Sequence, residues 1–181
     1  MKQNSEKKPS KKDIQKQLNS IFRMLRDLRN MMKYFLGTYS NYVGKAAEQL
    51  TASIIAKINE MGGINLGGVH VGPIEILSRN LKGENYEIDL IGVDDEKNIW
   101  IVETTTYPIF DLTIANKIYR RIKRWYNKNK QSPCFILFAY GGIEKGIYAV
   151  LENELKKICK KVILLDKIQA RSLLEILDSN K

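Results

Sequence analysis

Two acidic residues, Asp89 and Glu103, each stand inside an apolar stretch of the sequence, where a carboxylate can bind a divalent metal ion. The patterns on either side of the polar loop 94–98 predict a β-hairpin. With that loop, Asp89 faces Glu103 across the hairpin, on the same face as Ile91 and Ile101. The sequence therefore predicts two carboxylates opposite each other at one end of an apolar face.

Like charges directly across two strands destabilise a sheet, and partial burial strengthens their repulsion. The arrangement is favourable if a cation lies between the carboxylates, and Mg²⁺ (or Mn²⁺) takes such hard oxygen ligands together with water and phosphate. The alternative is a register shifted by one residue, which would make Asp89 and Glu103 plain surface acids. In either case we expect Asp94, Asp95 and Glu96, in the loop, to be surface acids.

The composition points to a polyanionic partner. The chain has 181 residues, 44% of them hydrophobic, and a net charge of +10, which favours nucleic acid or an anionic membrane surface. The most apolar run, residues 134–140, is too short to span a membrane, and no apolar region follows the charged N-terminus as in a signal peptide. With one histidine, a zinc site of His and Cys is nearly excluded. Cys134 and Cys159 lie in apolar patterns, which is typical of buried thiols in a reducing cytoplasm.

The elements that must position the acids follow from the periodicity of the apolar residues. Glu48 belongs to a predicted helix, and the hairpin acids belong to a meander that a basic helix follows. The fold class is therefore α/β. The predicted elements are helix 42–61, strands 70–78, 86–93 and 99–105, helix 112–128, strand 134–140, helix 144–159, strand 162–165 and helix 168–177.

An apolar stripe with a strict heptad spacing precedes this domain, and Gly37 is expected to end its helix. The spacing favours a coiled coil between subunits, in a dimer or a higher even oligomer, over an amphipathic helix packed on its own domain. The stripe consists of Ile14, Leu18, Ile21, Leu25, Leu28, Met32 and Phe35. The predicted organisation is a disordered basic tail over residues 1–12, a coiled-coil helix over 13–37 and one domain over 38–181.

The predicted helix 112–128 carries many positive charges and no acid. Its buried stripe is expected to be Ile118, Ile122 and Trp125. Charge runs are commonly solvated faces, but such faces usually mix signs for pairing one turn apart, and this helix does not. We therefore expect the helix to contact phosphates of nucleic acid. The side chains predicted to bind are Arg120, Arg121, Lys123, Arg124 and Lys128.

The order and spacing of these elements resemble the PD-(D/E)XK nuclease superfamily, which includes restriction endonucleases and archaeal Holliday-junction resolvases. The resemblance covers about residues 40–166, with Gly44-x-x-x-Glu48 on a helix, then the acids of the meander, a basic helix and an αβ return. The stretch 101–108, together with the coiled-coil helix, looks like nuclease-like proteins of hyperthermophilic archaea and their viruses. The resemblance implies a restriction-endonuclease-like core, which is a mixed central sheet flanked by helices.

The resemblance also implies roles for single residues. Asp89 and Glu103 match the two metal-binding acids of the family. The backbone carbonyl of Thr104 matches a further metal ligand, and Glu48 matches the helical acid that assists through a water or a second metal.

The departure from the family lies at Thr105, where the family has a lysine. Threonine cannot supply that positive charge. Lys117, on the helix that follows, is the candidate replacement. Alternatively, a second metal suffices, or the chain binds DNA without cutting it.

The resemblance thus implies a Mg-dependent endonuclease that hydrolyses phosphodiester bonds in DNA, with junctions or flaps as structures it could select. One rival is a catalytically inactive DNA-binding protein with the nuclease fold. A pure binder has no reason to hold three acids beside a phosphate-binding surface, because they weaken binding. A bare coiled-coil adaptor leaves the hairpin acids unexplained. A cytoplasmic location is expected, in the host cell if the protein is viral.

Overall fold

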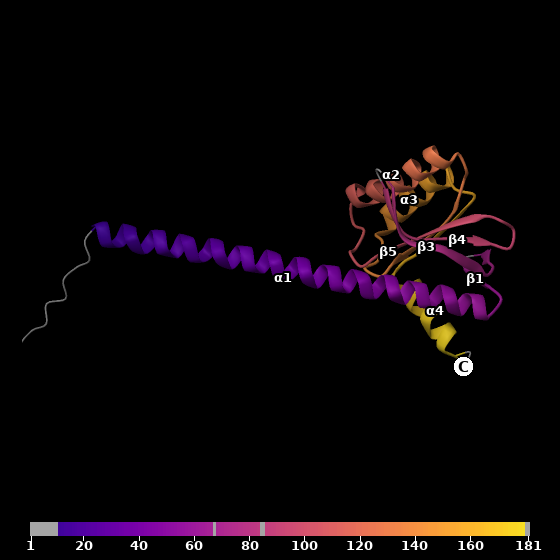
Figure 1. Ribbon diagram of the computed structural model, residues 1–181, viewed down its shortest axis with the longest axis horizontal. Coiled ribbons are helices and arrows are strands. Elements are labelled where there is room, and N and C mark those ends of the chain that lie inside the picture. The colour runs from indigo at the N-terminus through magenta and orange to yellow at the C-terminus, as the bar shows by residue number, and fades with distance from the viewer. Residues whose placement is uncertain (1–10, 67, 84–85, 180–181) are drawn as a thin grey trace, which may run out of the picture. The chain divides into compact units, whose positions relative to one another are not determined.

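The computed structural model describes residues 11–66, 68–83 and 86–179 and shows a mixed α/β fold within them (Figure 1). A long helix comes first, then a short hairpin, and then a sheet whose later strands alternate with helices. In chain order the elements are α1 (Lys11–Glu60), β1 (Ile64–Leu66), β2 (Val69–Val71), β3 (Ile74–Gly83), β4 (Tyr86–Asp94), β5 (Ile99–Thr105), α2 (Leu112–Asn129), β6 (Cys134–Ala139), α3 (Lys145–Lys156), β7 (Lys161–Leu165) and α4 (Lys167–Ser179). Within this described part, no helix combines the length and the apolar character that crossing a membrane requires.

Helix α1 runs from Lys11 to Glu60, so the helix end expected at Gly37 is wrong. A single glycine costs a helix only about 1 kcal/mol relative to alanine, which a helix of this length tolerates. The helix predicted separately over 42–61 is the continuation of α1. The chain divides into two compact units, one up to Tyr42 and one from Val43.

The structure describes only part of the predicted basic tail and of the predicted heptad stripe. Residues 1–10, most of the expected basic tail, lie outside the described residues. The same holds for the side chains of four stripe members, Ile14, Leu18, Ile21 and Phe35. The other three, Leu25, Leu28 and Met32, are exposed in the single chain. The coiled coil therefore stays a prediction.

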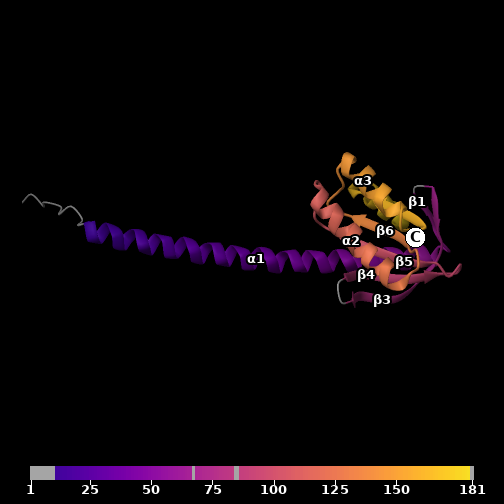
Figure 2. The same ribbon diagram turned by 90° about the horizontal axis from the view of Figure 1, so that it is seen from above.

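The main sheet has five strands in the order β3–β4–β5–β6–β7. The β3–β4 and β4–β5 pairs are antiparallel, whereas the β5–β6 and β6–β7 pairs are parallel. Parallel neighbours require crossover connections, which α2 and α3 supply. These two helices cover one face of the sheet, and α4 with the C-terminal part of α1 covers the other (Figures 1 and 2). The expectation of a mixed central sheet flanked by helices is confirmed.

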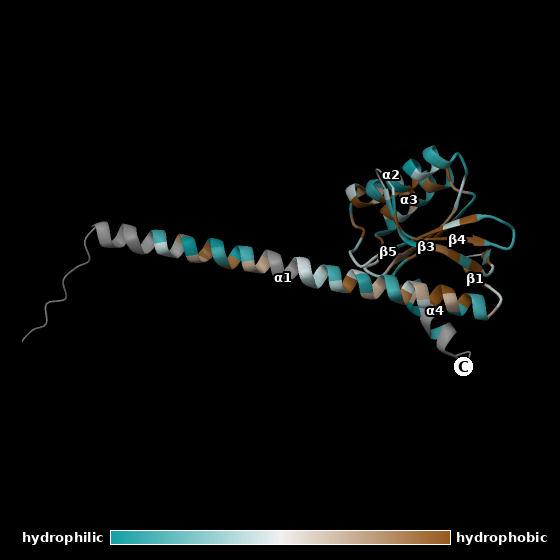
Figure 3. Ribbon diagram, in the orientation of Figure 1, coloured by the Kyte–Doolittle hydropathy of each residue, from teal (hydrophilic) through white to brown (hydrophobic). Residues whose placement is uncertain are grey.

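Strand β6 forms the centre of the core, and all its residues are buried. Its side chains alternate between the two faces, as a strand requires. Cys134, Ile136 and Phe138 pack with α1 and α4. Phe135, Leu137 and Ala139 pack with α2 and α3. In Figure 3 the strands of the main sheet are coloured largely as hydrophobic, whereas α2 carries many hydrophilic residues.

Both cysteines are buried free thiols, as the sequence predicts. Burial raises the pKa of the Cys159 thiol to about 12, and it raises the pKa of Cys134 as well. A buried thiol with a raised pKa forms little thiolate at neutral pH, which is typical of structural cysteines.

The predicted strand 70–78 is wrong in detail, because two strands cover it. Strand β2 pairs with β1 in a small hairpin, and β3 begins only at Ile74. The side chain of Asn59 bonds both backbone groups of Ile74: its amide donates to the carbonyl, and its Oδ1 accepts from the N–H, each at 2.7 Å. This pair of hydrogen bonds ties the end of α1 to the first strand of the sheet.

Asp94 is not the surface acid that the sequence analysis expected, since only 7% of it is exposed. Its carboxylate accepts hydrogen bonds from the indole N–H of Trp100 at 2.8 Å and from the backbone N–H of Asn98 at 2.8 Å. Burial acts to raise the pKa of Asp94, but these hydrogen bonds outweigh it and lower the pKa below its usual value. Asp94 therefore fixes the β4–β5 turn.

Candidate metal centre and nucleic-acid interface

The β4–β5 hairpin has the predicted register. Val93 pairs with Ile99 and Ile91 pairs with Ile101, so the two strands are not shifted by one residue. The last pair of the ladder is Leu90 with Val102. Asp89 and Glu103 are the next residues on their strands, at the point where the backbone pairing stops.

Beyond the last backbone pair, the side chain of Asp89, and not the backbone of β4, accepts the hydrogen bond of the next β5 residue. The Oδ2 atom of Asp89 accepts a hydrogen bond of 2.7 Å from the backbone N–H of Thr104 on β5. The N–H and the carbonyl of a strand residue point to the same side, so the Thr104 carbonyl is also directed toward β4. The carboxylate of Asp89 and the Thr104 carbonyl are thus on the same side of β5, as the family resemblance implies.

Glu103 is almost completely buried, with 2% of it exposed. Its Oε2 accepts a hydrogen bond from Nη1 of Arg121 on α2, and the two groups form an ion pair. Its other oxygen, Oε1, is buried and has no hydrogen-bond partner. A buried carboxylate oxygen without a partner is costly, which makes Oε1 the natural place for a ligand.

Burial and a neighbouring carboxylate raise the affinity of both acids for protons. Burial raises the pKa of Asp89 to about 6, the Thr104 amide opposes the rise, and the charge of Glu48 adds to it. For Glu103, burial and then the charge of Asp89 raise the pKa well above its usual value, against the opposing effect of Arg121. For Glu103, the effects of burial and of the Asp89 charge therefore outweigh the favourable contact with Arg121.

Glu48, on α1, lies beside Asp89. The two carboxylates line one groove of about 460 Å³, which also contains the cations Lys45, Arg79 and Lys82. Glu48 is half-buried, so its carboxylate remains accessible to water. The structure thus brings the predicted helical acid to Asp89, one of the two hairpin acids.

Three hydroxyl groups attach this part of α1 to the sheet. The Thr104 hydroxyl donates to the Thr51 hydroxyl at 3.1 Å, and Thr51 shares a further hydrogen bond of 3.1 Å with the Tyr140 hydroxyl. Thr51 follows Glu48 by about one helical turn. The hydroxyl chain therefore fixes the position of Glu48 relative to β5.

The donor set fits a hard divalent cation. Among the described residues, no group of three or more His, Cys, Asp and Glu side chains forms a ready-made metal cluster. A magnesium site does not need one, because Mg²⁺ usually takes one or two carboxylates and keeps several waters. Asp89 and the unpartnered Oε1 of Glu103 provide such ligands.

Thr105, which stands where the family resemblance would place a lysine, has a local structural role. The Thr105 hydroxyl bonds the backbone of Tyr107 in both directions, each at 3.3 Å, and so closes the turn after β5. The expected replacement, Lys117, is exposed and lines a groove on α2. The cation that contacts Glu103 is Arg121, about one turn further along the same helix. The geometry thus favours Arg121 over Lys117 for this role.

Helix α2 begins at a strong N-cap, because the Asp111 carboxylate accepts from the backbone N–H groups of Thr113 and Ile114. It buries the predicted stripe, together with Ala115, against the sheet. The opposite side contributes Lys117, Arg120, Arg121 and Arg124 to a groove of about 480 Å³.

Two of the cations predicted on α2 lie against aromatic rings. Lys123 lies over Tyr119, with its Nζ 5.4 Å from the ring centroid. Lys128 lies over Tyr86 at 5.7 Å, and Tyr86 lines the groove of α2. Tyr86 therefore places Lys128 near the groove.

The two grooves share Lys82 and Glu87, so they adjoin each other along β3 and β4. Sequence reasoning missed Lys45, Arg79 and Lys82. They are separated along the chain and form no charge run, so only the fold brings them together.

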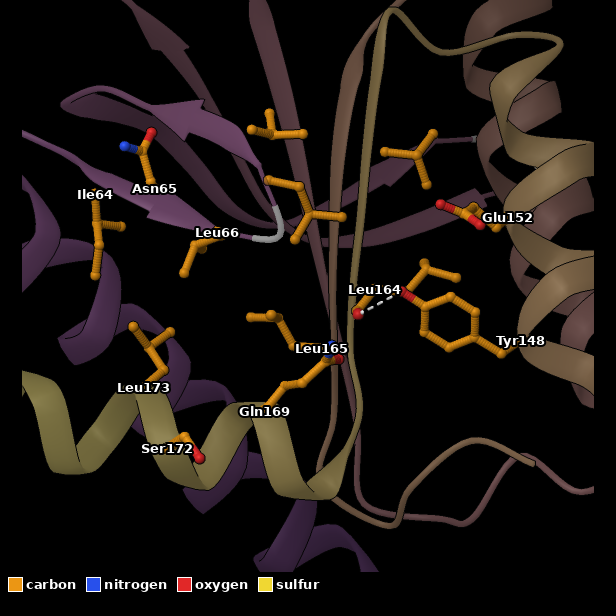
Figure 4. A pocket seen from close by; sticks show the side chains of 13 residues that line it. Ile64, Asn65, Leu66, Tyr148, Glu152, Leu164, Leu165, Gln169, Ser172 and Leu173 are labelled. Carbon is orange, nitrogen blue, oxygen red and sulfur yellow. Dashed lines mark hydrogen bonds between the residues drawn. The ribbon is translucent and has the colours of Figure 1, made fainter. Parts of the chain in front are cut away.

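A cavity of about 240 Å³ lies beside the edge strand β7, and neither Asp89 nor Glu103 lines it (Figure 4). Its described lining is mainly apolar and contains one charged side chain, Glu152. The Tyr148 hydroxyl donates to the carbonyl of Leu164 across one side of it. This lining does not suit a polyanion.

Comparisons with known proteins gave two similar solved structures. No family model and no curated protein matches the chain. The chain is similar to a repair endonuclease from Pyrococcus abyssi, with 20% identity and a TM-score of 0.40 over 52% of this chain and 39% of that one. It is also similar to EndoMS in a complex with double-stranded DNA, with 17% identity and a TM-score of 0.40 over 52% of this chain and 37% of that one. The chain thus spans about two fifths of each of these proteins.

Proposed function

We propose that this chain is a divalent-metal-dependent DNA endonuclease of the PD-(D/E)XK type, with its metal site at Asp89 and Glu103. The observation that carries the proposal is the buried, unpartnered Oε1 of Glu103 beside Asp89. A buried carboxylate whose pKa is raised by a neighbouring carboxylate is unfavourable in a fold unless a cation joins the two. Mg²⁺ or Mn²⁺ meets that requirement with hard oxygen ligands.

The residues that would hold the ion are Asp89, Glu103 and the carbonyl of Thr104. When bound, the ion polarises the phosphoryl group and lowers the pKa of a water molecule. The chain's own groups set the geometry: the Thr104 amide orients Asp89, and Arg121 holds Glu103. Glu48 lines the same groove as Asp89, where its carboxylate would orient a water molecule.

Arg121 replaces the motif lysine in this proposal. Its guanidinium contacts the acidic site and also lines the basic groove, and 36% of its side chain is exposed. It can therefore contact a phosphate while it remains near Glu103. A cation aimed at charge that develops in the transition state contributes roughly a hundredfold to a thousandfold in rate.

The two grooves supply the phosphate-binding surface. One contains Lys45, Arg79 and Lys82 next to Asp89, and the other contains the cations of α2. Cations on both sides of the acids suit a backbone that passes across the metal site. Contacts of this kind are independent of base sequence, so we expect structure or accessibility rather than sequence to select the target. DNA junctions and flaps are the first substrates to test.

A second candidate is a catalytically inactive nuclease-fold protein that binds DNA. The observation that favours it is the ion pair between Arg121 and Glu103, because it occupies one oxygen of the key acid. Thr105 also lacks the motif charge. In that case the arginine would neutralise Glu103 permanently, and no ion would bind.

A cleavage assay separates the two candidates. Supercoiled, linear, flap and four-way-junction DNA are incubated with the full chain in Mg²⁺, Mn²⁺ or EDTA. We expect metal-dependent cleavage that Asp89→Asn and Glu103→Gln abolish, whereas Asp95→Asn, in the exposed β4–β5 turn, retains it. Absence of cleavage with either metal, together with tighter DNA binding by Glu103→Ala, would establish the inactive binder.

A further inference from the structure

The first unit of the chain exposes many large apolar side chains on one helix. Eight such residues of α1 up to Tyr42 are exposed by half or more: Phe22 68%, Met24 60%, Leu25 55%, Leu28 51%, Met31 54%, Met32 56%, Tyr39 70% and Tyr42 74%. A helix with this much apolar surface requires a partner surface in water.

The heptad positions of these residues follow from the spacing. In a heptad, a precedes d by three residues, and d precedes the next a by four. Leu18, Leu25 and Met32 therefore occupy a, while Ile14, Ile21 and Leu28 occupy d. Tyr39 and Tyr42 continue the a and d positions, and α1 is helical throughout this stretch. The stripe thus extends past Gly37 to the end of the first unit.

The position of Gly37 agrees with this assignment. Gly37 falls at f, on the outer side of a coiled coil, and a side chain added there would meet nothing within 4 Å. Arg23 falls at f, and Arg26 falls at b. Positive charges at outward positions face solvent, where their mutual repulsion is screened.

The apolar face is wider than two helices would cover. In two-stranded coiled coils, e and g are commonly Glu or Lys. Here Phe22 occupies e, and Met24 and Met31 occupy g, while Arg29 is the charged residue at the next e position. These flanking positions become buried when more helices join the bundle. In addition, Leu at a with Ile at d shifts the preference from two strands toward larger assemblies.

From these observations we propose that residues 14–42 form a four-helix coiled coil between four copies of this chain. The occupant of the exposed face is the same face of three further copies. The proposal does not depend on nuclease activity.

Sedimentation velocity of the full chain at micromolar concentration tests it. We expect a mass near that of four chains of 20.9 kDa each. The matched variant exchanges the core residues without changing composition: Ile14→Leu, Leu18→Ile, Ile21→Leu and Leu25→Ile. β-Branched residues at a with Leu at d favour two strands, so this variant should sediment as a dimer.

A second variant removes the wide face instead: Phe22→Gln, Met24→Gln and Met31→Gln should also give a dimer, while its a and d residues are unchanged. Asn30→Gln, at the exterior f position, is the control and should remain a tetramer. A monomeric, dimeric or trimeric wild type overturns the proposal. So does a tetramer that both sets of changes leave intact.

Discussion

Arg121 and Glu103 form an ion pair that joins α2 to β5, and it engages only one of the two carboxylate oxygens. Asp89 is close enough to raise the pKa of Glu103 further, and Glu48 adds negative charge beside Asp89. Buried Glu103 therefore has Arg121 as its ion-pair partner and Asp89 as an acidic neighbour that opposes its charge. Stability, metal binding and DNA binding should all respond to these charges.

Arg121→Ala should destabilise the metal-free protein. Removing the guanidinium leaves buried Glu103 without its partner, which costs about 2 kcal/mol in the free energy of unfolding. Adding Glu103→Gln to this variant should recover much of the loss, because a neutral amide needs no cation. Urea unfolding in EDTA at pH 8 measures both effects. Arg120→Ala, exposed on the same helix, should change the free energy by less than about 0.5 kcal/mol. Equal losses at the two arginines would contradict the role of the pair.

The metal-free protein should lose stability as pH rises from about 4 to about 6. The folded pKa of Asp89, about 6, lies above the unfolded value of 3.8, so the folded state binds the proton more tightly. The proton-linked stabilisation is present at low pH and is lost as pH rises through the folded pKa, with a size on the order of 3 kcal/mol. Urea midpoints between pH 4 and pH 8 in EDTA measure it. Asp89→Asn should flatten this dependence, and Asp95→Asn should not.

Divalent metal should stabilise the fold in a saturable manner. An ion that binds only the folded state at 100 times its Kd adds about 2.7 kcal/mol. Thermal unfolding with increasing Mg²⁺ or Mn²⁺ should show a rising Tm in the wild type. Asp89→Asn and Glu103→Gln should abolish the rise, whereas Glu96→Gln, in the exposed turn, should preserve it. If the rise survives in both acid variants, the ion binds elsewhere.

Lys82 should contribute to DNA affinity as much as Arg120 does, because it lines both grooves. Each alanine substitution should weaken binding to all DNA structures and reduce the slope of log affinity against log salt by about one unit. Fluorescence anisotropy from low to high salt measures the slope. Lys97→Asn is the matched control: it removes a charge at the far end of the hairpin and suits the positive φ of 64° there. A slope unchanged by Lys82→Ala would place the DNA elsewhere.

The hairpin and its acids were predictable because they depend on local sequence. The alternation of apolar residues and the loop length set the register, and Val93 pairs with Ile99 as expected. Asp94 was mispredicted because its burial depends on the indole of Trp100, which no loop pattern reveals. The helix end at Gly37 was mispredicted because a favourable helix on both sides outweighs one glycine.

The partner of Glu103 was harder to predict. Lys117 and Arg121 lie one turn apart and share a helix side, so periodicity does not distinguish them. Which turn faces Glu103 depends on the path of residues 106–111, which is a tertiary property. The presence of Lys45 and Lys82 in the groove of Asp89 was also not predictable, because they come from separate elements that only the tertiary fold brings together.

The sequence separations within the site also imply an order of assembly during folding. The Asp89–Thr104 bond spans 15 residues and the Arg121–Glu103 bond spans 18, whereas the Thr51–Tyr140 bond that fixes α1 spans 89. Contacts with short loops form at lower entropic cost. The hairpin and α2 can thus associate early, and the arginine then relieves a repulsion that would oppose the hairpin alone. Glu48 is expected to join the site later, because the bonds of Thr51 that fix α1 span 53 residues to Thr104 and 89 residues to Tyr140.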